Sequence, residues 1–336
     1  MTYAVAVAHP NVALAKYWGK RARPGNFPAV PSLSVTLDGM TTRTRVTFDA
    51  ALTKDEMILG GALASAGDHA RASMILDRVR RASHEKRFAR VESANDFPTA
   101  SGLASSASGY AALALAATTA AKAELGVDVV SDLARRGSAS AARSLFGGFV
   151  ELAAGAPEGD EEEILSARPL ASESALDVRV LACVVTESAK TSSSRDGMAK
   201  TAKESPYFSA WIGAEDRFFE EMKRALLASD LERVGELTEQ STLAMHACAM
   251  SAGVVYVRGI TLELFDAVRE LRMGGAAAWA TSDAGPHVKV LVSSKDAMRS
   301  RAVLEAVPGV LRVIESKPGG PARVVESVTL SGGEAS

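Results

Sequence analysis

The chain has 336 residues, a hydrophobic content of 47% and a formal net charge of −2, which suits one large or two ordinary domains and gives no general attraction to nucleic acid or acidic membranes. Its two cysteines, Cys183 and Cys248, lack the spacing of a zinc site or disulfide frame, and no apolar run is long enough to span a bilayer. We therefore expect a cytoplasmic protein without nucleic-acid or membrane partners, whose anion sites are local.

The first apolar segment ends in a cluster of cations and aromatic residues. Residues 3–15 predict a short buried strand interrupted at His9-Pro10-Asn11, and Lys16-Tyr17-Trp18-Gly19-Lys20-Arg21 follows. A basic surface turn would explain Arg21 and Arg23. Lys16 continues the apolar strand directly, where a charge needs a partner. Lys16 and Lys20 are therefore interpreted as phosphate ligands in a cleft.

Two segments of alternating polarity come next. Residues 32–37 and 41–48 predict strands, and Asp38-Gly39 between them predicts a hairpin. A helix over 70–87 and a short strand over 90–94 lead to the following motif.

The stretch from Asn95 to Gly109 has the character of a phosphate-binding loop. Pro98 ends the strand, Gly102 allows the backbone to approach a ligand, and the free N–H groups of the helix that follows would favour an anion. Hydroxyl groups surround its first turns, at Ser101, Ser105, Ser106 and Ser108. Neither a Walker A loop nor the dinucleotide fingerprint fits. A capped, tightly packed helix explains the stretch, taken alone, equally well.

An arginine in apolar surroundings marks the next segment, residues 128–146. Ser140 and Arg143 are three apart and would share a helix face, and Ser138 precedes them at a helix-cap position. Close packing would explain the small residues around them. A guanidinium between alanines and Leu145-Phe146 needs a partner, and a substrate carboxylate would serve.

The second half of the chain adds two polar stretches. Residues 153–163 form an acidic loop at a predicted domain edge, and a strand over 178–186 precedes the hydroxyl-rich run from Thr191 to Met198. This run leads into a helix, which suits an anion, although a mobile linker is an alternative. Helices are predicted over 211–228, 231–252 and 259–273, with His246 as a core or interface residue.

Asp283 stands after a predicted strand (276–281) and before Gly285-Pro286, with another strand over 288–293. Turn capping and catalysis are both open for this carboxylate. No catalytic histidine, cysteine dyad or metal-ligand cluster competes with it in the sequence.

Taken together, five motifs resemble the diphosphomevalonate decarboxylase family of the GHMP kinase superfamily, in the same order and over about residues 4 to 330. They are Lys16 to Arg21, Asn95 to Gly109, Arg136 to Gly148, Ser194 to Met198 and Asp283 to Pro286. The resemblance implies an α+β, two-domain GHMP kinase fold. An N-terminal domain like ribosomal protein S5 domain 2 (1–175) would precede a ferredoxin-like C-terminal domain (176–330) and a short tail (331–336), with the active-site cleft between the domains.

The resemblance also implies an activity. The enzyme would decarboxylate mevalonate 5-diphosphate to isopentenyl diphosphate, ADP, phosphate and CO2, after ATP has phosphorylated the 3-hydroxyl. ATP and Mg²⁺ would be the cofactors, without a metal site of the protein's own, and a homodimer is expected.

Individual roles follow from the same resemblance. Asp283 would accept or orient the hydroxyl proton, kept ionised by Lys16, while Arg143, held by Asn11, would fix the substrate carboxylate. Ser106 and Ser194 would lie near the transferring phosphate. The remaining substrate contacts would be Tyr17, Lys20, Ser138, Ser140, Arg195 and Met198. The ATP contacts would be Asn95, Pro98, Ser101, Gly102, Leu103, Ala104, Ser105 and Ser106.

Three departures from the family pattern concern the substrate. Val30-Pro31 stands where the family has Asn-Ser, His287 stands where it has Asn, and the segment after Met245-His246-Ala247 lacks the usual Asn. A decarboxylase or 3-kinase acting on mevalonate 5-phosphate is therefore the alternative enzyme, and a non-catalytic ATP-binding sensor is the alternative from another class.

Overall fold

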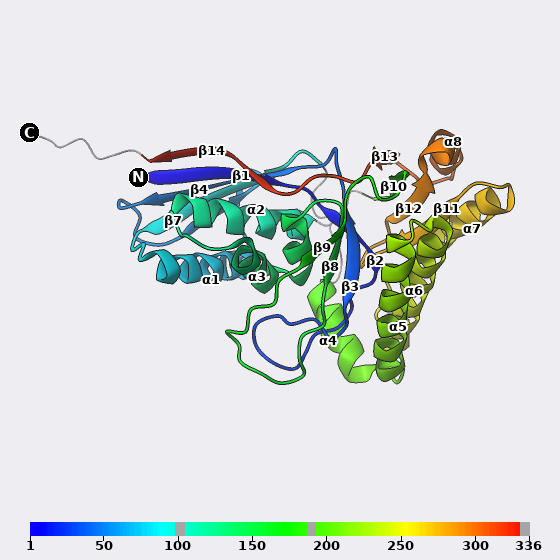
Figure 1. The fold of residues 1–336 in the computed structure, drawn as a ribbon, viewed down its shortest axis with the longest axis horizontal. Coiled ribbons are helices and arrows are strands. Elements are labelled where there is room, and N and C mark those ends of the chain that lie inside the picture. Colours follow the sequence, from blue (N-terminus) through cyan, green and yellow to red (C-terminus); the bar gives the residue numbers. More distant parts are fainter. Residues whose placement is uncertain (98–104, 187–192, 330–336) are drawn as a thin grey trace, which may run out of the picture.

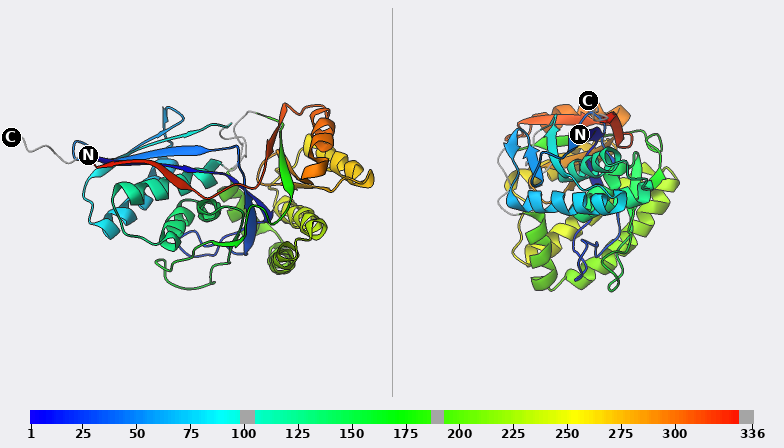
Figure 2. Two further views of the ribbon diagram at one scale, coloured as in Figure 1. Left: turned by 45° about the horizontal axis from the view of Figure 1, so that its top comes forward. Right: turned by 90° about the vertical axis from the view of Figure 1, so that its left-hand side faces the viewer.

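The computed structural model describes residues 1–97, 105–186 and 193–329. Two halves, each a sheet with helices, lie side by side, and a small third sheet lies between them (Figure 1). The N-terminal strand and the last strand run next to each other in the first half (Figures 1 and 2). The fold is α+β, as predicted.

A six-stranded sheet in the order β14-β1-β4-β7-β5-β6 forms the first half. Its strands are β1 (Thr2–Ala8), β4 (Thr42–Asp49), β5 (Glu56–Leu59), β6 (Ala62–Leu63), β7 (Phe88–Asn95) and β14 (Arg323–Thr329). Helix α2 (Ser105–Ala120) packs on this sheet, and α1 (Ala66–Ser83) and α3 (Val127–Gly137) pack against α2. Alternate strand residues such as Ala4, Ala6, Val46 and Phe48 meet the alanines of α2. The small side chains let this helix lie close to the sheet.

The second half is built on an antiparallel sheet in the order β11-β12-β10-β13. Its strands are β10 (Val178–Val184), β11 (Ala278–Ser282), β12 (Val288–Ser293) and β13 (Arg312–Ser316). One face packs on α7 (Gly259–Met273) and α8 (Ala297–Glu305). The other packs on α5 (Phe208–Leu227) and α6 (Leu231–Ser251). Because both faces are covered, even the polar residues of β12 are buried.

The third sheet, in the order β2-β3-β8-β9, joins the halves. It consists of β2 (Asn11–Ala15), β3 (Ser32–Thr36), β8 (Phe149–Leu152) and β9 (Arg168–Ala171). Val12, Leu14 and Leu33 share one core with Met222 and Leu226 of α5. Two 3₁₀ helices, η1 (Ala139–Leu145) and η2 (Ser294–Asp296), and the helix α4 (Ser194–Glu204) complete the architecture.

The predicted hairpin at Asp38-Gly39 is wrong. Strand β3 pairs with β2 and β8, whereas β4 pairs with β1 and β7 in another sheet. The N–H of Leu37 donates to the carbonyl of Pro10, and that of Asp38 to the carbonyl of Lys317. The turn therefore carries the chain from one sheet to the next. The alternating pattern identified both strands correctly but carried no information about their partners.

Other elements lie close to their predicted positions: α7 and β12 have the predicted ends. The domain boundary after residue 175 stays a prediction. Within the range predicted for the C-terminal domain, β14 pairs with β1 of the first half. The predicted tail lies outside the described residues. Among the helices the structure describes, none has the length and apolar character needed to cross a membrane.

Candidate active site

Three adjoining pockets meet at the start of α2, where Ser106 lines all of them. The central pocket brings together residues that the sequence analysis took from every motif. It is lined by Asn11, Ala13, Lys16, Tyr17, Trp18, Ser106, Ser138, Ser140, Arg143, Ser194, Met198, Met245, Asp283 and Ala284. Apart from Asn95, Ser105, Lys20 and Arg195, which line the neighbouring pockets, all predicted site residues that the structure describes lie in this one.

A carboxylate between two lysines forms the floor of the central pocket. Lys16, directly after β2, donates from Nζ to Oδ1 of Asp283 at 2.7 Å. Lys289 of β12 donates to Oδ2 at 3.0 Å. The side chains of Lys16 and Lys289 are 1% and 3% exposed, while that of Asp283 is 29% exposed. Only the carboxylate is therefore open to a ligand.

The two ammonium groups decide the charge state of Asp283. Burial alone would raise the pKa of its carboxyl, but Lys16 and Lys289 outweigh it and hold the pKa well below its usual range. Burial lowers the pKa of Lys16, and Asp283 opposes that shift. Asp283 is thus a permanently ionised hydrogen-bond acceptor with little tendency to take up a proton.

Arg143 faces the same pocket from η1. Its Nε donates to Oγ of Ser34 at 2.9 Å and its Nη1 to Oγ of Ser32 at 2.6 Å. Its Nη2 lies 3.4 Å from Oδ1 of Asn11, which agrees with the predicted support by Asn11. Burial lowers the pKa of Arg143 to about 10, opposed by Asp283 and Tyr17. Its hydrogen bonds within the described chain go to neutral oxygens, so a guanidinium charge remains for a ligand.

The second pocket, called the basic pocket here, adjoins the central one beyond Tyr17. Lys20, Arg71 and Arg195 contribute cations to it, and Ser138, Ser194 and the first turn of α4 line it too. Burial first, and then Arg195 and Arg71, lower the pKa of Lys20 to about 8. A helix start and three cations form an anion site.

Tyr17 lies between the central and basic pockets and lines both. Its hydroxyl is buried without a hydrogen-bond partner among the residues described. Burial raises the pKa of this hydroxyl, opposed first by Arg143. A neutral phenol between two anion pockets can donate to a ligand that extends through both.

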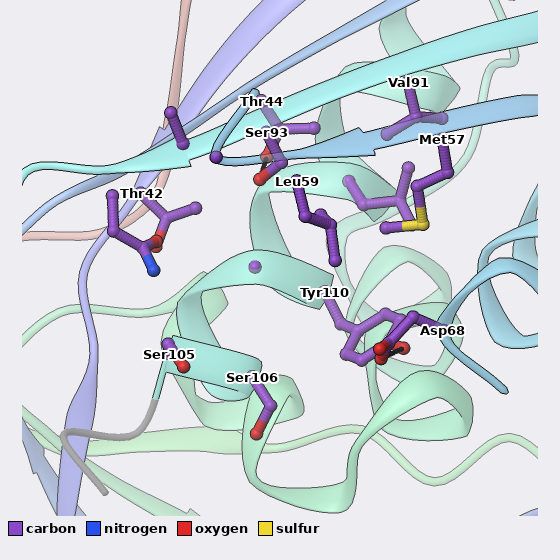
Figure 3. A pocket seen from close by; sticks show the side chains of 15 residues that line it. Thr42, Thr44, Met57, Leu59, Asp68, Val91, Ser93, Ser105, Ser106 and Tyr110 are labelled. Carbon is purple, nitrogen blue, oxygen red and sulfur yellow. Dashed lines mark hydrogen bonds between the residues drawn. The ribbon is translucent and has the colours of Figure 1, made fainter. Parts of the chain in front are cut away.

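The third pocket, called the α2 pocket here, has an apolar wall (Figure 3). Met57, Leu59 and Val91 lie on its strand side, and Ser105 and Ser106 lie where α2 begins. Asn95, also in the lining, accepts a hydrogen bond from Thr42 at 2.6 Å. A flat, partly apolar group with an attached anion fits a slot that ends at a helix start. The other predicted ATP contacts lie outside the described residues: Pro98, Ser101, Gly102, Leu103 and Ala104.

Several residues that line these pockets or bond to their lining escaped the sequence analysis. Lys289 had a signal, a lysine inside an apolar strand six residues after Asp283. Ser32 and Ser34 had one too, since alternate residues of a strand share a face. Arg71 had no signal in the sequence, because a surface arginine on a helix gives no hint that it turns into a pocket. Its Nε donates to the hydroxyl of Tyr110 at 2.6 Å, and both residues line the basic pocket.

Two of the three departures from the family pattern, Val30-Pro31 and His287, lie behind the pocket walls. Val30 packs with Trp18 and Met198. His287 is fully buried, and its Nδ1 accepts a hydrogen bond from the N–H of Val185. Among the described residues that line the three pockets, neither Val30, Pro31 nor His287 occurs. The departures at Val30-Pro31 and His287 therefore lie outside the linings of the three pockets.

Comparison with known proteins gives the same assignment for both halves. Residues 8–163 match the diphosphomevalonate decarboxylase-like N-terminal domain, and residues 180–319 match the mevalonate 5-diphosphate decarboxylase C-terminal domain. Diphosphomevalonate decarboxylase of Candida albicans is 32% identical, over 97% of this chain and 99% of its own. The chain belongs to the diphosphomevalonate decarboxylase family. It has the GHMP kinase fold of that family.

Two further members of this family bear on the ligands. A solved structure of MDDEF in complex with MVAPP, AMPPCP and magnesium has a TM-score of 0.87 and 35% identity, covering 97% of this chain and 99% of its own. Phosphomevalonate decarboxylase of Haloferax volcanii is 34% identical, over 80% of this chain and 81% of its own. Family membership therefore includes enzymes named for two different substrates.

Proposed function

We propose that this chain is an ATP-dependent decarboxylase of mevalonate 5-diphosphate, forming isopentenyl diphosphate, ADP, phosphate and CO2. The observation that carries the proposal is the order of charges along the connected pockets. Arg143, a buried cation that has no ion pair among the described residues, would bind the substrate carboxylate. Asp283 would face the 3-hydroxyl, and the cations of the basic pocket would bind the diphosphate.

The charge on the basic pocket favours a diphosphate over a monophosphate. Lys20, Arg71 and Arg195 bring three cations, while Asp68 bonds to Arg71 and offsets one of them. Burial and then the neighbouring cations Arg195 and Arg71 lower the pKa of Lys20. A multiply charged anion would relieve the repulsion among these cations. A single phosphate reaches fewer of these groups.

Asp283 would act by orienting the hydroxyl more than by removing its proton. A general base works best when its pKa lies near the working pH, and two lysines hold the pKa of Asp283 far below that. Phosphoryl transfer needs mainly positioning and charge stabilisation. Asp283 would therefore accept the hydrogen bond that aims the hydroxyl oxygen. As the new O–P bond forms and the bond between that phosphorus and ADP breaks, the hydroxyl proton would pass to an oxygen of the transferred phosphoryl group.

ATP would lie with its base in the α2 pocket and its phosphates along the start of α2. Ser105 and Ser106 offer hydroxyl groups there, and the first helical amides are free to bind phosphate. Among the described residues, no three acidic, histidine or cysteine side chains are placed so that they could hold a metal ion. Mg²⁺ would thus be held mainly by phosphate oxygens and water, near Ser106, and would neutralise charge on the phosphates.

The test is a direct measurement of products. Purified protein with Mg-ATP is expected to release CO2, ADP and phosphate from mevalonate 5-diphosphate, with kcat/KM at least about tenfold above that for the 5-phosphate, equivalent to about 1.4 kcal/mol. Phosphorylated product without CO2 would identify a 3-kinase. ATP binding without turnover would identify the sensor.

Preference for mevalonate 5-phosphate is the second candidate, favoured by the similarity to the Haloferax volcanii enzyme. It predicts an equal or reversed ratio of kcat/KM in the same assay. Because Val30, Pro31 and His287 lie outside the linings of the three pockets, we expect mevalonate 5-diphosphate to be the better substrate.

We also infer a cytoplasmic homodimer. Both cysteines are buried free thiols, in keeping with a reducing compartment. Exposed apolar side chains such as Leu243 and Met250 on α6 offer surface for a second copy. Sedimentation velocity at micromolar concentration is expected to give twice the 35.0 kDa mass, and a monomer would contradict this.

A further inference from the structure

A buried carboxyl group lies at the main-chain end of Lys16. Glu215 of α5 is fully buried, and its Oε2 accepts a hydrogen bond from Oγ of Ser241 on α6 at 2.8 Å. The same Ser241 oxygen accepts the backbone N–H of Lys16 at 2.9 Å. A continuous chain of hydrogen bonds therefore runs from Glu215 through Ser241 to Lys16, whose Nζ then reaches Asp283.

Glu215 differs from the other deeply buried acids. Asp132 is bonded by Arg135 and Arg136, and Asp55 by Arg80. Glu215 has no ion pair within the described ranges, and its Oε1 has no hydrogen-bond partner there. Such a group costs free energy that a leucine of similar size would avoid. Packing alone therefore gives no reason for a carboxyl at this position.

The strand geometry explains why Lys16 needs support from behind. The register of β2 against β3 shifts between Ala13 and Ala15, at the end of the ladder. Beyond it, the N–H of Lys16 takes a helix side chain, Ser241, as its acceptor. The position of this residue relative to Asp283 is therefore set by α5 and α6 as well as by its own sheet.

The titratable groups around Lys16 come from four elements. They are Asp283 in the β11–β12 turn, Lys289 on β12, His246 on α6 and Glu215 on α5. Burial lowers the pKa of His246 to about 4, so it is neutral. Burial raises the pKa of Glu215 well above its usual range, opposed first by Ser241 and then by Lys16. An ionised Glu215 in turn favours the charged form of Lys16.

We infer that Glu215 is a positioning residue that anchors the main chain of Lys16 through Ser241 and, once ionised, supplies a second carboxylate that keeps its ammonium group charged. The inference rests on the proposed role of Lys16 in orienting Asp283. As the pH rises, ionisation of Glu215 would delay the loss of the proton from Lys16. Asp283 would bond to the Nζ of Lys16, and Glu215 would support its backbone N–H through Ser241.

The kinetic test uses Glu215→Gln, which keeps the size and an acceptor for Ser241 but removes the charge. The alkaline limb of the kcat–pH profile is expected to move to lower pH by about half a unit or more. Ser241→Ala breaks the relay and should lower kcat roughly fivefold, the effect of one hydrogen bond, while moving the limb less. Glu220→Gln, an exposed change on the same helix, is the control and should leave both unchanged.

A second measurement does not depend on turnover. With [ε-13C]lysine, the Lys16 resonance, assigned by its absence in Lys16→Arg, is expected to titrate at lower pH in Glu215→Gln than in the wild type. Glu215→Met removes the charge without burying an amide and should shift it the same way. Equal titration in folded wild type and both variants would overturn the inference. If the wild type released no CO2, the proposed function would be refuted instead. The NMR titration would still decide the role of Glu215.

Discussion

The central and basic pockets use cations in opposite ways. At the floor of the central pocket, Lys16 and, behind it, Lys289 are nearly inaccessible, and both are bonded to Asp283. In the basic pocket Arg195 is exposed, and Lys20 and Arg71 are half-buried. Lys20 has no ion pair within the described part of the chain, and its pKa falls to about 8. In the first group both cations are bonded to a carboxylate of the protein. In the second, only Arg71 has such a partner among the described residues, and the remaining charge is available to a ligand.

This difference assigns the reaction step to the central pocket and the binding of the substrate's phosphates to the basic pocket. A carboxylate fixed by two buried lysines cannot reorganise when substrate arrives, which is what a preorganised site requires. Cations that repel one another gain free energy when an anion binds, so they contribute to affinity. Changes in the central pocket should therefore act on kcat, and changes in the basic pocket on KM and on its pH dependence.

The largest effect is expected from Asp283→Asn. The variant keeps the shape but loses the charged acceptor, so kcat should fall about a hundredfold or more with little change in KM. It also leaves Lys16 and Lys289 without their counter-ion, so Tm should fall by several degrees. Steady-state kinetics and a thermal melt measure both.

The double variant with Lys16→Met is its control. Removing one of the two lysines should recover part of the Tm without recovering kcat. The losses in kcat of Asp283→Asn and Lys16→Met, expressed as free energies, should sum to more than the loss of the double variant. A folded Asp283→Asn protein with near-normal kcat would remove this carboxylate from the mechanism. Full additivity would mean that Lys16 acts independently of it.

Arg143→Lys should cost about thirtyfold in kcat/KM for the phosphorylated mevalonate. A lysine cannot reach Ser32, Ser34 and a ligand carboxylate together, because it lacks the planar fork. Arg135→Lys is the matched control, since Arg135 is equally buried but already bonded to Asp132. It should lower Tm and leave kcat/KM nearly unchanged. Equal kinetic losses in both would mean that Arg143 only supports the fold.

The pH dependence of kcat/KM should report Lys20. Its pKa is lowered, so below about pH 8 the ammonium group is charged and binds the anion, and above it the charge is lost. In the free enzyme kcat/KM should therefore fall about tenfold per pH unit above pH 8. Bound anion raises the pKa again, so kcat should stay level there. In Lys20→Arg the limb near pH 8 should disappear, and its persistence would assign it to another group.

The smallest effect is expected from Arg195→Ala. Arg195 is exposed at the first turn of α4, so its loss should raise the KM for the diphosphate about fivefold and leave the KM for ATP unchanged. Arg217→Ala, an exposed arginine on α5, is the control. A raised KM for ATP instead, with the diphosphate unaffected, would mean that α4 binds the nucleotide.

The sequence allowed the Lys16–Asp283 pair and the support of Arg143 by Asn11 to be predicted, because the motifs of the family contain them. It allowed most helices and strands to be placed as well, since their periodicity is local. The partner of β3 could not be predicted in this way, because strand pairing depends on which segments share a core. Lys289 and Arg71 were missed for a related reason. Each reaches its pocket from an element whose position is set by distant packing.

The antiparallel pairing of β14 with β1 has a consequence for biosynthesis. Residues 2–7 find their partners at positions 323–329, so β1 leaves the ribosome long before the strand with which it pairs. The opposite edge of β1 can pair with β4 much earlier. Closing so long a loop slows folding, so the sheet of the first half lacks β14 until that strand has been synthesised and has paired. Until then β1 is an exposed sheet edge with which other chains could pair.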